Sequence, residues 1–361
     1  MPSKIASPSL AEELSSVAGL IDDLIANDSY PVPVRPLLLR KAVSRYPCLG
    51  GKRIRPALLL WSCGALGGNV ERATSVAAAV EVYHNWSLVH DDIIDQDDFR
   101  RGEPTTHHAV AAEARKAFGL DNARAVKYGT DLAILAGDLQ RGWASSLILG
   151  SVDAGVPPAV ALFLGRELCG NIDRGLISGE ALDVELAHRS IEDIRPREVE
   201  RMIALKTGVL LRFCAEAGAR LALGHCRQDA SVQRLGDFAA AAGAAFQLKD
   251  DWLGVFGDTE VTGKPVGSDI RAAKPTLLIL SALGKLTGKR RRELLDCLGS
   301  DTPSALRTAR KAIRDSGAEN AILAKAARLV DKAKTTLRPL PPGKHKQLLL
   351  ALADAFVNRD K

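Results

Sequence analysis

The sequence has few aromatic residues: 8 Phe, 4 Trp and 4 Tyr make up 4% of the 361 residues. A protein that stacks single-stranded bases on aromatic rings would normally have more of them. The net charge of +6 is also too small to indicate a polyanionic partner by itself. With 25% charged and 46% hydrophobic residues, the chain is neither disordered nor a disulfide scaffold. We therefore expect a globular protein that is not a base-stacking binder of single strands, and the net charge leaves nucleic acid, an acidic surface and anionic small molecules equally open as partners.

Three further absences concern compartment and membrane. The six cysteines are widely spaced and form no CxxC pair, so we interpret them as free thiols in a reducing compartment. The first ten residues have one lysine and no apolar core, which predicts no secretory leader. The longest apolar stretches are far shorter than the roughly 20 residues that span a bilayer. We expect a cytoplasmic protein without a transmembrane span.

Helical periodicity dominates what the sequence does contain. Apolar residues recur at intervals of three and four, and strand-like alternation is nearly absent. This pattern predicts an all-α protein with helices at 35–47, 53–66, 71–98, 106–118, 124–150, 157–189, 197–223, 230–253, 271–284, 289–298, 302–316, 318–336 and 345–358. Neither an internal repeat nor a low-complexity linker divides the chain. We therefore expect one domain, residues 1–361, with about the first 30 residues peripheral to it.

One interruption of this pattern is long and rich in glycine. Residues 254–269 read GVFGDTEVTGKPVGSD and follow a strongly predicted helix. Loops of this length inside compact domains are often lids or binding loops, although a solvated surface loop has the same composition.

The first acidic cluster lies near the end of the predicted helix 71–98. Asp91 and Asp95 are four residues apart and therefore share a helix face. Like charges at this spacing destabilise a helix, so we expect a divalent cation to offset them. Carboxylate ligands without a nearby cysteine favour Mg²⁺ over Zn²⁺. His84 lies two turns earlier on the same face, although a lone histidine would be interpreted as a packed core or surface residue.

A second acidic cluster, Phe246-Gln-Leu-Lys-Asp250-Asp251, ends the predicted helix 230–253. Gln247 and Asp250 share a face at a spacing of three. One such cluster is most simply a polar helix end. Two of them in an all-helical chain suggest carboxylate arrays of the kind that build metal sites in helix bundles.

Basic residues accompany both clusters in distinctive local settings. Lys52 and Arg55 follow a pair of glycines at the start of a predicted helix, and Arg100-Arg101 directly follow the first acidic cluster. Lys206-Thr207-Gly208 interrupts a helical pattern, and Lys264 lies in the glycine-rich stretch. Lysine and arginine bind phosphate oxygens. Aspartate pairs combined with such cations predict a diphosphate substrate that binds with metal, whereas nucleic acid would not explain the aspartates.

Together these blocks resemble the trans-type isoprenyl diphosphate synthases. The resemblance runs from Gly50 to the C-terminus and rests on GGKRIRP (50–56), DDIID (91–95), RRGEPTTH (100–107), KTG (206–208), FQLKDDWLGVFGD (246–258) and GKPVGSD (263–269). A lone DDxxD would be weak evidence, but this ordered set is specific. The resemblance implies a single large helical bundle around a central cavity, the isoprenoid synthase fold. It also implies Mg²⁺ as the cofactor and a homodimer.

The resemblance implies a role for each matched residue. Those expected to hold isopentenyl diphosphate are Lys52, Arg55, His84 and Arg101. Those expected on the allylic diphosphate are Arg100, Lys206, Thr207, Gln247 and Lys264. The expected metal ligands are Asp91, Asp95 and Asp250. The expected catalytic set is Asp91, Asp92, Asp95, Arg100, Lys206, Asp250 and Lys264. Arg359 resembles a basic tail that closes over the isopentenyl site.

The sequence departs from the family pattern in three places. Gly254 stands where the second motif has its third aspartate. Gly179 is followed by Glu180 rather than glutamine, although Asp183 is retained, and Lys274 is followed by proline. These departures affect the second metal site more than the activity, because the first aspartate of each motif is present.

The implied reaction is a head-to-tail condensation of isopentenyl diphosphate with dimethylallyl, geranyl or farnesyl diphosphate. In the family, a bulky residue at the position of Trp86 limits elongation. Trp86 beside the small Ser87 resembles geranylgeranyl diphosphate synthases most, with farnesyl or longer-chain products as alternatives. On a helical wheel Ser87 shares the face of Asp91 and Trp86 does not, so Trp86 could instead be a packing residue.

Two alternative functions of a different class are also considered. A non-catalytic subunit of a heteromeric prenyl synthase usually lacks one or both aspartate motifs, and this chain keeps both. A class I terpene cyclase also has an aspartate-rich helix, but it would not need GGKRIRP and RRG for a second diphosphate.

Overall fold

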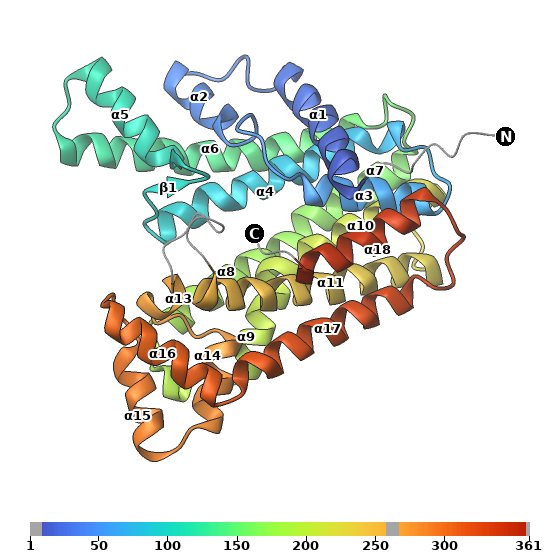
Figure 1. The fold of residues 1–361 in the computed structure, drawn as a ribbon. Helices are drawn as coiled ribbons and strands as arrows, with labels where there is room; N and C mark the ends of the chain where they lie inside the picture. Colours follow the sequence, from blue (N-terminus) through green and yellow to red (C-terminus); the bar gives the residue numbers. More distant parts are fainter. Residues whose placement is uncertain (1–8, 258–266, 359–361) are drawn as a thin grey trace. The chain divides into compact units, whose positions relative to one another are not determined.

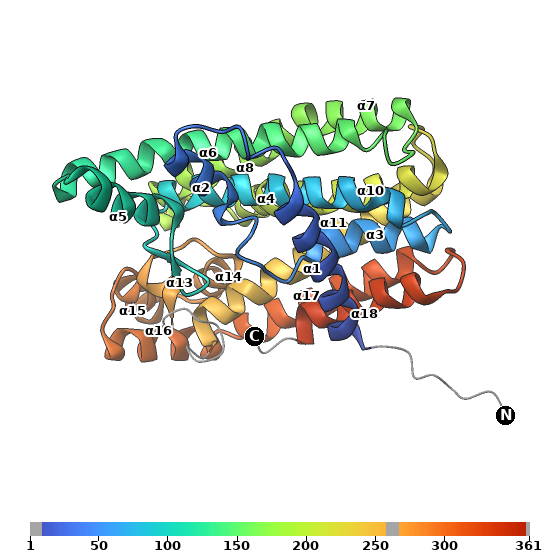
Figure 2. The same ribbon diagram turned by 90° about the horizontal axis from the view of Figure 1, so that it is seen from above.

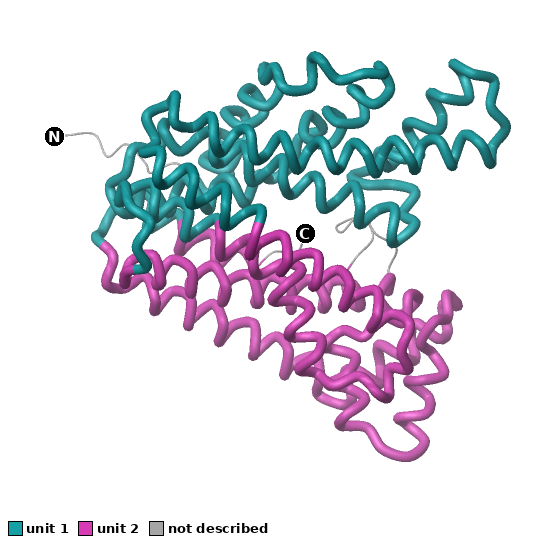
Figure 3. Tube along the Cα trace, turned by 180° about the vertical axis from the view of Figure 1, so that it is seen from behind, with its two compact units in different colours: residues 1–169, 214–228, 341–348 teal, residues 170–213, 229–340, 349–361 magenta. Residues whose placement is uncertain are grey.

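The computed structural model describes residues 9–257 and 267–358 (Figure 1). They divide into two compact units (Figure 3). The described residues of unit 1 are 9–169, 214–228 and 341–348, and those of unit 2 are 170–213, 229–257, 267–340 and 349–358. The chain passes from one unit to the other within α10 (Val209–Leu223) and α18 (Lys344–Asn358), so neither unit is one continuous segment. The expectation of a single domain stays a prediction.

Two long helices of unit 1, α4 (Thr74–Ile94) and α6 (Asn122–Gly150), lie side by side (Figures 1 and 2). Glycine allows their close approach at one point, because a Cβ on Gly137 would lie 2.2 Å from Nε2 of His90. That imidazole nitrogen lies 3.1 Å from the carbonyl oxygen of Ile134 on α6. The contact ties the end of α4 that carries the first acidic cluster to α6.

Shorter helices complete unit 1. Both α2 (Leu37–Arg45) and α5 (Thr106–Phe118) pack against α6. Helix α1 (Leu10–Asn27) packs against α3 (Ile54–Ala65) and α4. The remaining elements are η1 (Glu71–Ala73) and α7 (Pro158–Glu167). Helix α1 buries Val17, Ile21 and Ile25.

A small hairpin follows α4. Strands β1 (Phe99–Arg100) and β2 (Glu103–Pro104) pair antiparallel and are the only strands among the described residues. The turn between them has φ of 55° at Arg101 and 80° at Gly102. Two successive positive φ angles are what a tight two-residue hairpin turn requires, and they hold Arg100 and Arg101 close to the end of α4.

In unit 2, α11 (Ala230–Phe256) packs along α17 (Ala318–Thr336), as Figures 1 and 2 show. The other elements are α8 (Asp173–Ala187), η3 (Ile191–Asp193), α9 (Pro196–Ile203), α13 (Ser268–Arg271), α14 (Leu277–Lys285), α15 (Gly288–Cys297) and α16 (Pro303–Asp315). Helix α11 carries the second acidic cluster near its C-terminal end.

Two segments have π-helical geometry, η2 (Leu168–Ile172) and η4 (Ala204–Gly208). Such π turns often occur at functional sites because they redirect the side chains that follow. Segment η4 contains Lys206 and Thr207, where the sequence predicted an interruption of the helix. The predicted helices 157–189 and 197–223 therefore exist as α–π–α runs.

The prediction of an all-α protein is confirmed for the described residues. Helix α1 escaped the sequence analysis, which placed its first helix at 35. The predicted helix 271–284 is wrong as one element, because α13 ends at Arg271 and α14 begins at Leu277, where Thr276 caps its first turn. Helix α11 extends to Phe256, and residues 258–266 of the glycine-rich stretch lie outside the described residues. No helix in the described ranges combines the length and apolar character needed to cross a bilayer.

Candidate active site

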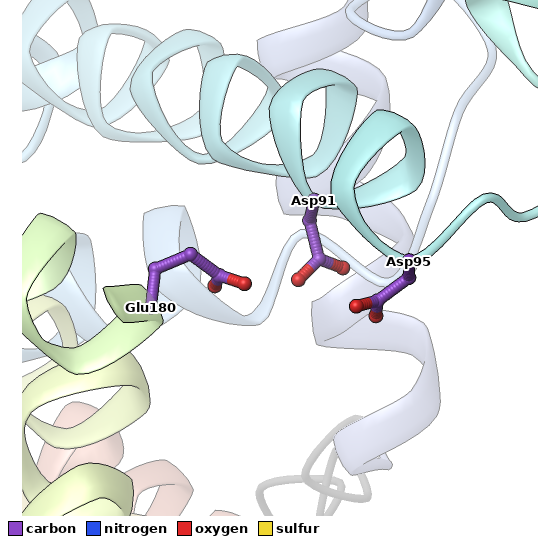
Figure 4. Close-up of side chains that lie close together, drawn as sticks. All are labelled: Asp91, Asp95 and Glu180. Atoms are coloured by element: carbon purple, nitrogen blue, oxygen red, sulfur yellow. The ribbon is translucent and has the colours of Figure 1, made fainter. Parts of the chain in front are cut away.

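Asp91 and Asp95 form a carboxylate pair at the end of α4. Figure 4 shows both side chains on the same side of the helix, and the pair can offer carboxylate oxygens within 4.8 Å of each other. This is the shared face that their spacing predicted. Glu180, also labelled in Figure 4, belongs to α8 of unit 2.

Asp92 points elsewhere and is buried. The Tyr46 hydroxyl donates a hydrogen bond to one carboxylate oxygen of Asp92. Nε of Arg100 donates to the other at 2.6 Å. Burial raises the pKa of Asp92, and the hydrogen bonds from Arg100 and Tyr46 act against that rise. Asp92 thus anchors the hairpin arginine to α4 and to the segment that follows α2.

Arg100 also reaches the carboxylate pair, since its Nη2 donates to Asp91 at 3.2 Å. Burial alone would favour loss of its proton, but the bond to Asp92 and the charges of Asp92 and Asp91 raise the pKa of Arg100. A permanently charged guanidinium therefore stands directly beside the carboxylates.

A second group of cations acts on His84 of α4. Burial and then the charges of Arg55 and Arg101 lower the pKa of His84 well below 6.5, so its ring is neutral. Nε of Arg55 is buried and has no hydrogen-bond partner among the described residues. Lys52, by contrast, is exposed. Arg55 and Arg101 therefore supply positive charge close to a neutral imidazole.

The glycine pair before Lys52 allows the side chain of Arg101 to pack against the backbone. Gly51 has φ of 148°, and a Cβ there would lie 2.9 Å from Nη1 of Arg101. That guanidinium donates to the carbonyl of Gly50. Gly50 and Gly51 of GGKRIRP thus form the surface against which Arg101 of the hairpin packs.

Trp86 is buried on the side of α4 that faces α6. Its ring lies 4.9 Å from that of Tyr83 and 5.9 Å from that of His90, between centroids. The guanidinium carbon of Arg141 on α6 is 5.7 Å from the centroid of Trp86. Ser87, one residue on, donates to the carbonyl of His84 at 2.8 Å. Trp86 therefore packs between α4 and α6, and its role as a limit on elongation stays a prediction.

In unit 2, Lys206 lies between two carboxylates of α8. Its Nζ is 2.8 Å from Glu180 and 2.7 Å from Asp183. A Cβ on Gly179 would lie 2.3 Å from the backbone nitrogen of Lys206, so glycine is needed where α8 meets η4. The Glu180 that departs from the family pattern therefore adds a second anion to the lysine.

A cavity adjoins this ion cluster within unit 2. Its polar lining consists of Asp183, Lys206, Thr207, Gln247, Asp251, Lys274 and Thr276. Nε2 of Gln247 donates to Asp251 at 3.2 Å. The other carboxylate oxygen of Asp251 is buried and has no hydrogen-bond partner among the described residues. Burial and the nearby charge of Asp269 raise the pKa of Asp251 to about 7.

Lys274 balances part of this negative charge. Burial favours its neutral form, but the charges of Asp183, Asp269 and Asp251 raise the pKa of Lys274. Asp250, the predicted metal ligand, is half-buried on α11 one residue before Asp251.

Comparison with known proteins identifies the family of the chain. The sequence profile of polyprenyl synthetases matches residues 37–315. The chain belongs to this family. A short chain isoprenyl diphosphate synthase of Methanothermobacter thermautotrophicus is 34% identical over 328 residues, which are 91% of this chain and 92% of the relative. The chain is accordingly a prenyltransferase of the isoprenyl diphosphate synthase type.

Two solved structures are similar over nearly the whole chain. Geranylgeranyl pyrophosphate synthetase from Pyrococcus horikoshii has a TM-score of 0.83 and 32% identity, covering 96% of this chain and 98% of that one. Geranylgeranyl pyrophosphate synthase from Corynebacterium glutamicum, complexed with isoprenyl diphosphate and magnesium, has a TM-score of 0.80 and 28% identity. It covers 98% of this chain and 100% of its own. The predicted isoprenoid synthase fold is therefore confirmed.

Some residues that the structure brings into these clusters had not been selected from the sequence. Tyr46, Arg53 and Glu81 belong to none of the predicted sets. Arg53 lies inside GGKRIRP but received no role there, because its partner Glu81 is far away in the chain, as Asp92 is from Tyr46. Lys274 had been noted only as a departure from the family. Lys264 and Arg359 lie outside the described residues.

Proposed function

We propose that the chain condenses isopentenyl diphosphate with an allylic diphosphate to form geranylgeranyl diphosphate, with Mg²⁺ as the cofactor. The observation that carries the proposal is the carboxylate pair of Asp91 and Asp95 with Arg100 beside it. A diphosphate that binds with metal needs both anionic ligands for the cation and a fixed positive charge for its own oxygens.

The donor set of α4 suits magnesium. Asp91 and Asp95 offer oxygen ligands within 4.8 Å of each other, and cysteine is absent from this stretch of α4. Mg²⁺ typically takes one or two carboxylates together with substrate phosphates. Asp250 would hold further metal. When bound, Mg²⁺ supplies neutralising charge for the departing pyrophosphate.

The other residues divide between the two diphosphates. Arg100, Lys206, Thr207 and Gln247 would hold the allylic diphosphate, together with Lys264. Lys52, Arg55, His84 and Arg101 would hold isopentenyl diphosphate. The neutral ring of His84 can donate one hydrogen bond to a phosphate oxygen without adding charge. We propose that Asp92 keeps Arg100 in position rather than binding metal itself.

The chemistry needs little from the side chains beyond charge and position. The allylic C–O bond breaks, and its electron pair leaves with pyrophosphate, whose developing charge Arg100 and Lys206 stabilise. The isopentenyl double bond then supplies the pair for the new C–C bond, and positioning by Arg55 and Arg101 lowers the entropic barrier to that step. The adduct loses a proton, which the departing pyrophosphate can accept.

We further propose a homodimer. Helix α6 exposes several large apolar side chains, namely Val126, Ile134, Leu135 and Leu149. Apolar side chains gathered along one helix are typical of a surface that another protein covers. Light scattering on the purified chain, giving twice the mass of 38.5 kDa, would support a dimer.

One assay tests the activity. Purified protein is incubated with Mg²⁺, isopentenyl diphosphate and, separately, each of three allylic primers, and the products are sized by chromatography. A 20-carbon product is expected. A shorter or longer product would correct the chain length alone. No product from any primer would contradict the proposal and favour a non-catalytic subunit, and a cyclic hydrocarbon would favour a terpene cyclase.

A further inference from the structure

Positive charge is concentrated in one part of unit 2. Residues 285–340 contain 14 Lys and Arg against 6 Asp and Glu, a net charge of +8. The rest of the chain contains 35 against 37, a net charge of −2, so this segment carries more than the whole surplus of +6. None of the residues proposed to hold the two diphosphates belongs to this segment. Substrate binding therefore does not account for its charge.

The segment folds into three helices that pack on one another. Helix α15 packs on α16, and α16 packs on α17. Figures 1 and 2 show α15 and α16 at one end of α17. Helix α16 buries Leu306 and Ile313 on one side, whereas Arg307 and Lys311 are exposed. The apolar residues thus hold the helices together and leave the cations in contact with solvent.

Part of this charge has no counter-charge within the protein. Some cations are paired, since Arg291 lies 2.5 Å from Glu192 and Lys325 lies 2.6 Å from Glu200. Six exposed cations of the segment form no ion pair with another described residue: Arg290, Arg292, Arg307, Lys311, Arg328 and Lys332.

The spacing of these unpaired cations opposes folding. Arg307 and Lys311 are four residues apart on α16, and Arg328 and Lys332 are four residues apart on α17. Like charges at this spacing share a helix face and destabilise the helix. Helix stability therefore does not explain the two pairs, whereas an anionic partner outside the protein would offset their repulsion.

We propose that these six cations bind the surface of an anionic lipid bilayer. Clusters of about four to eight Lys and Arg are attracted to the acidic headgroups of a leaflet. A strong charge asymmetry along a chain is typical of proteins that bind membranes or nucleic acid. Among the described residues of the segment no large apolar side chain is exposed. The attraction is accordingly one of charge, without insertion into the hydrocarbon.

Two arguments favour a bilayer over nucleic acid. Residues 285–340 contain no Phe, Trp or Tyr, so no ring is present to stack on the bases of a single strand. The second argument rests on the proposed function, because a prenyl diphosphate product has a long hydrocarbon chain that favours lipid over water. An enzyme held at a bilayer releases such a product where it dissolves.

Vesicle sedimentation of the full chain, without substrates, tests this binding. Vesicles of phosphatidylserine and phosphatidylcholine in equal parts are compared with vesicles of phosphatidylcholine alone. We expect wild type to bind the first and not the second. The bound fraction should fall as salt is raised, because salt screens exposed charges. Equal binding to both kinds of vesicle, or binding to neither, would overturn the inference.

A variant with four charges removed locates the binding surface. It carries Arg307→Gln, Lys311→Gln, Arg328→Gln and Lys332→Gln. Its affinity for the anionic vesicles should be at least about tenfold weaker, since each cation near an anionic leaflet strengthens binding by a factor of about five. Affinity within about twofold of wild type would overturn the inference.

The matched control removes the same charge from unit 1. It changes four exposed cations that form no ion pair with another described residue: Arg72→Gln, Arg115→Gln, Lys116→Gln and Arg166→Gln. It should bind the vesicles as wild type does. Equal losses in the control and in the α16–α17 variant would show that only net charge matters, and would overturn the assignment to this surface.

Further measurements separate lost charge from lost folding and from another partner. The double variant Arg307→Lys/Arg328→Lys keeps the charge and should keep vesicle binding, and loss of binding there would contradict an attraction of charge. Fluorescence anisotropy with a DNA duplex tests the other polyanion. Tighter binding to the duplex than to the vesicles, lost in the four-charge variant, would overturn the bilayer in favour of nucleic acid. Synthase activity is assayed separately, so an active enzyme that ignores anionic vesicles removes this surface alone, whereas an inactive chain that binds them removes only the proposed function.

Discussion

Nη1 of Arg53 lies 2.6 Å from Oε1 of Glu81, and both side chains are buried. The same guanidinium contacts Asp22 of α1 and donates to the carbonyl of Pro47 at 2.7 Å. Arg53 is the residue before α3 and has φ of 45°, an uncommon value for a residue other than glycine. The ion pair thus holds a strained backbone position between Lys52 and Arg55, the two residues proposed for isopentenyl diphosphate.

Glu81→Gln should reduce stability strongly. It leaves a buried guanidinium without its main counter-charge, and breaking a buried pair costs about 3–5 kcal/mol. Urea unfolding followed by circular dichroism measures the loss. The double variant Arg53→Met/Glu81→Met should lose clearly less than the sum of its two single variants. Additive losses would show that the pair is not energetically coupled.

Asp91→Asn should lower the turnover number by at least about a thousandfold, because it removes a carboxylate proposed to hold the cation that stabilises pyrophosphate. Asp138→Asn, at an exposed position of α6, is the control and should keep wild-type turnover. Steady-state rates at saturating Mg²⁺ and thermal melting of both variants are the measurements. A folded Asp91→Asn enzyme with wild-type turnover would rule out the α4 carboxylates as metal ligands.

Trp86→Ala should lengthen the products if the indole limits elongation, since it removes the bulk that Tyr83, His90 and Arg141 surround. Trp86→Phe, which keeps a ring, should leave the product distribution close to wild type. Chromatography of dephosphorylated products distinguishes the two. Unchanged chain length in a folded Trp86→Ala enzyme would leave Trp86 only the packing role between α4 and α6.

Gly179→Ala should destabilise unit 2 by about 1–3 kcal/mol, the usual effect of overpacking, and should shift Lys206. The added Cβ would lie 2.3 Å from the backbone nitrogen of Lys206. Gly170→Ala is the matched control, because a Cβ there meets no atom within 4 Å. Melting temperatures and the Michaelis constant for the allylic substrate should change in the first variant only. Equal melting temperatures would show that the contact between α8 and η4 adapts without penalty.

His84 should make the folded protein less stable in acid. The pKa of His84 in the folded protein lies well below 6.5, the usual value for histidine. Just below pH 6.5, His84 is therefore protonated in the unfolded chain but stays neutral in the folded protein. Stability therefore falls as the pH drops through the unfolded value. When the pH is lowered from about 7.5 to about 5.5, the melting temperature of His84→Gln should fall by less than that of wild type. Burial also lowers the pKa of His107 and His345, so the loss should shrink rather than vanish.

A control at an exposed histidine makes this test specific. His188→Gln changes a residue at the exposed end of α8 and should leave the pH dependence of melting as in wild type. If His84→Gln also left it unchanged, the neutral, buried state assigned to His84 would be incorrect.

The sequence by itself determined the helical architecture and most of the proposed site. The periodicity of apolar residues predicts α5 at the observed residues, because apolar residues three and four positions apart form one face of a helix. Spacing also puts Asp91 and Asp95 on one face of α4. These inferences succeed because their interactions lie within a few residues.

Only the tertiary structure decided which charges meet across the chain. Asp91 and Asp92 are neighbours in sequence, yet Asp91 joins Asp95 while Asp92 turns to Tyr46 and Arg100. Likewise, the sequence does not distinguish Arg53 from its neighbours Lys52 and Arg55. Only the structure shows that Glu81 lies against the guanidinium of Arg53. Side-chain partners over such separations depend on how helices pack, and helical periodicity carries no information about the residue that faces a given one from another helix.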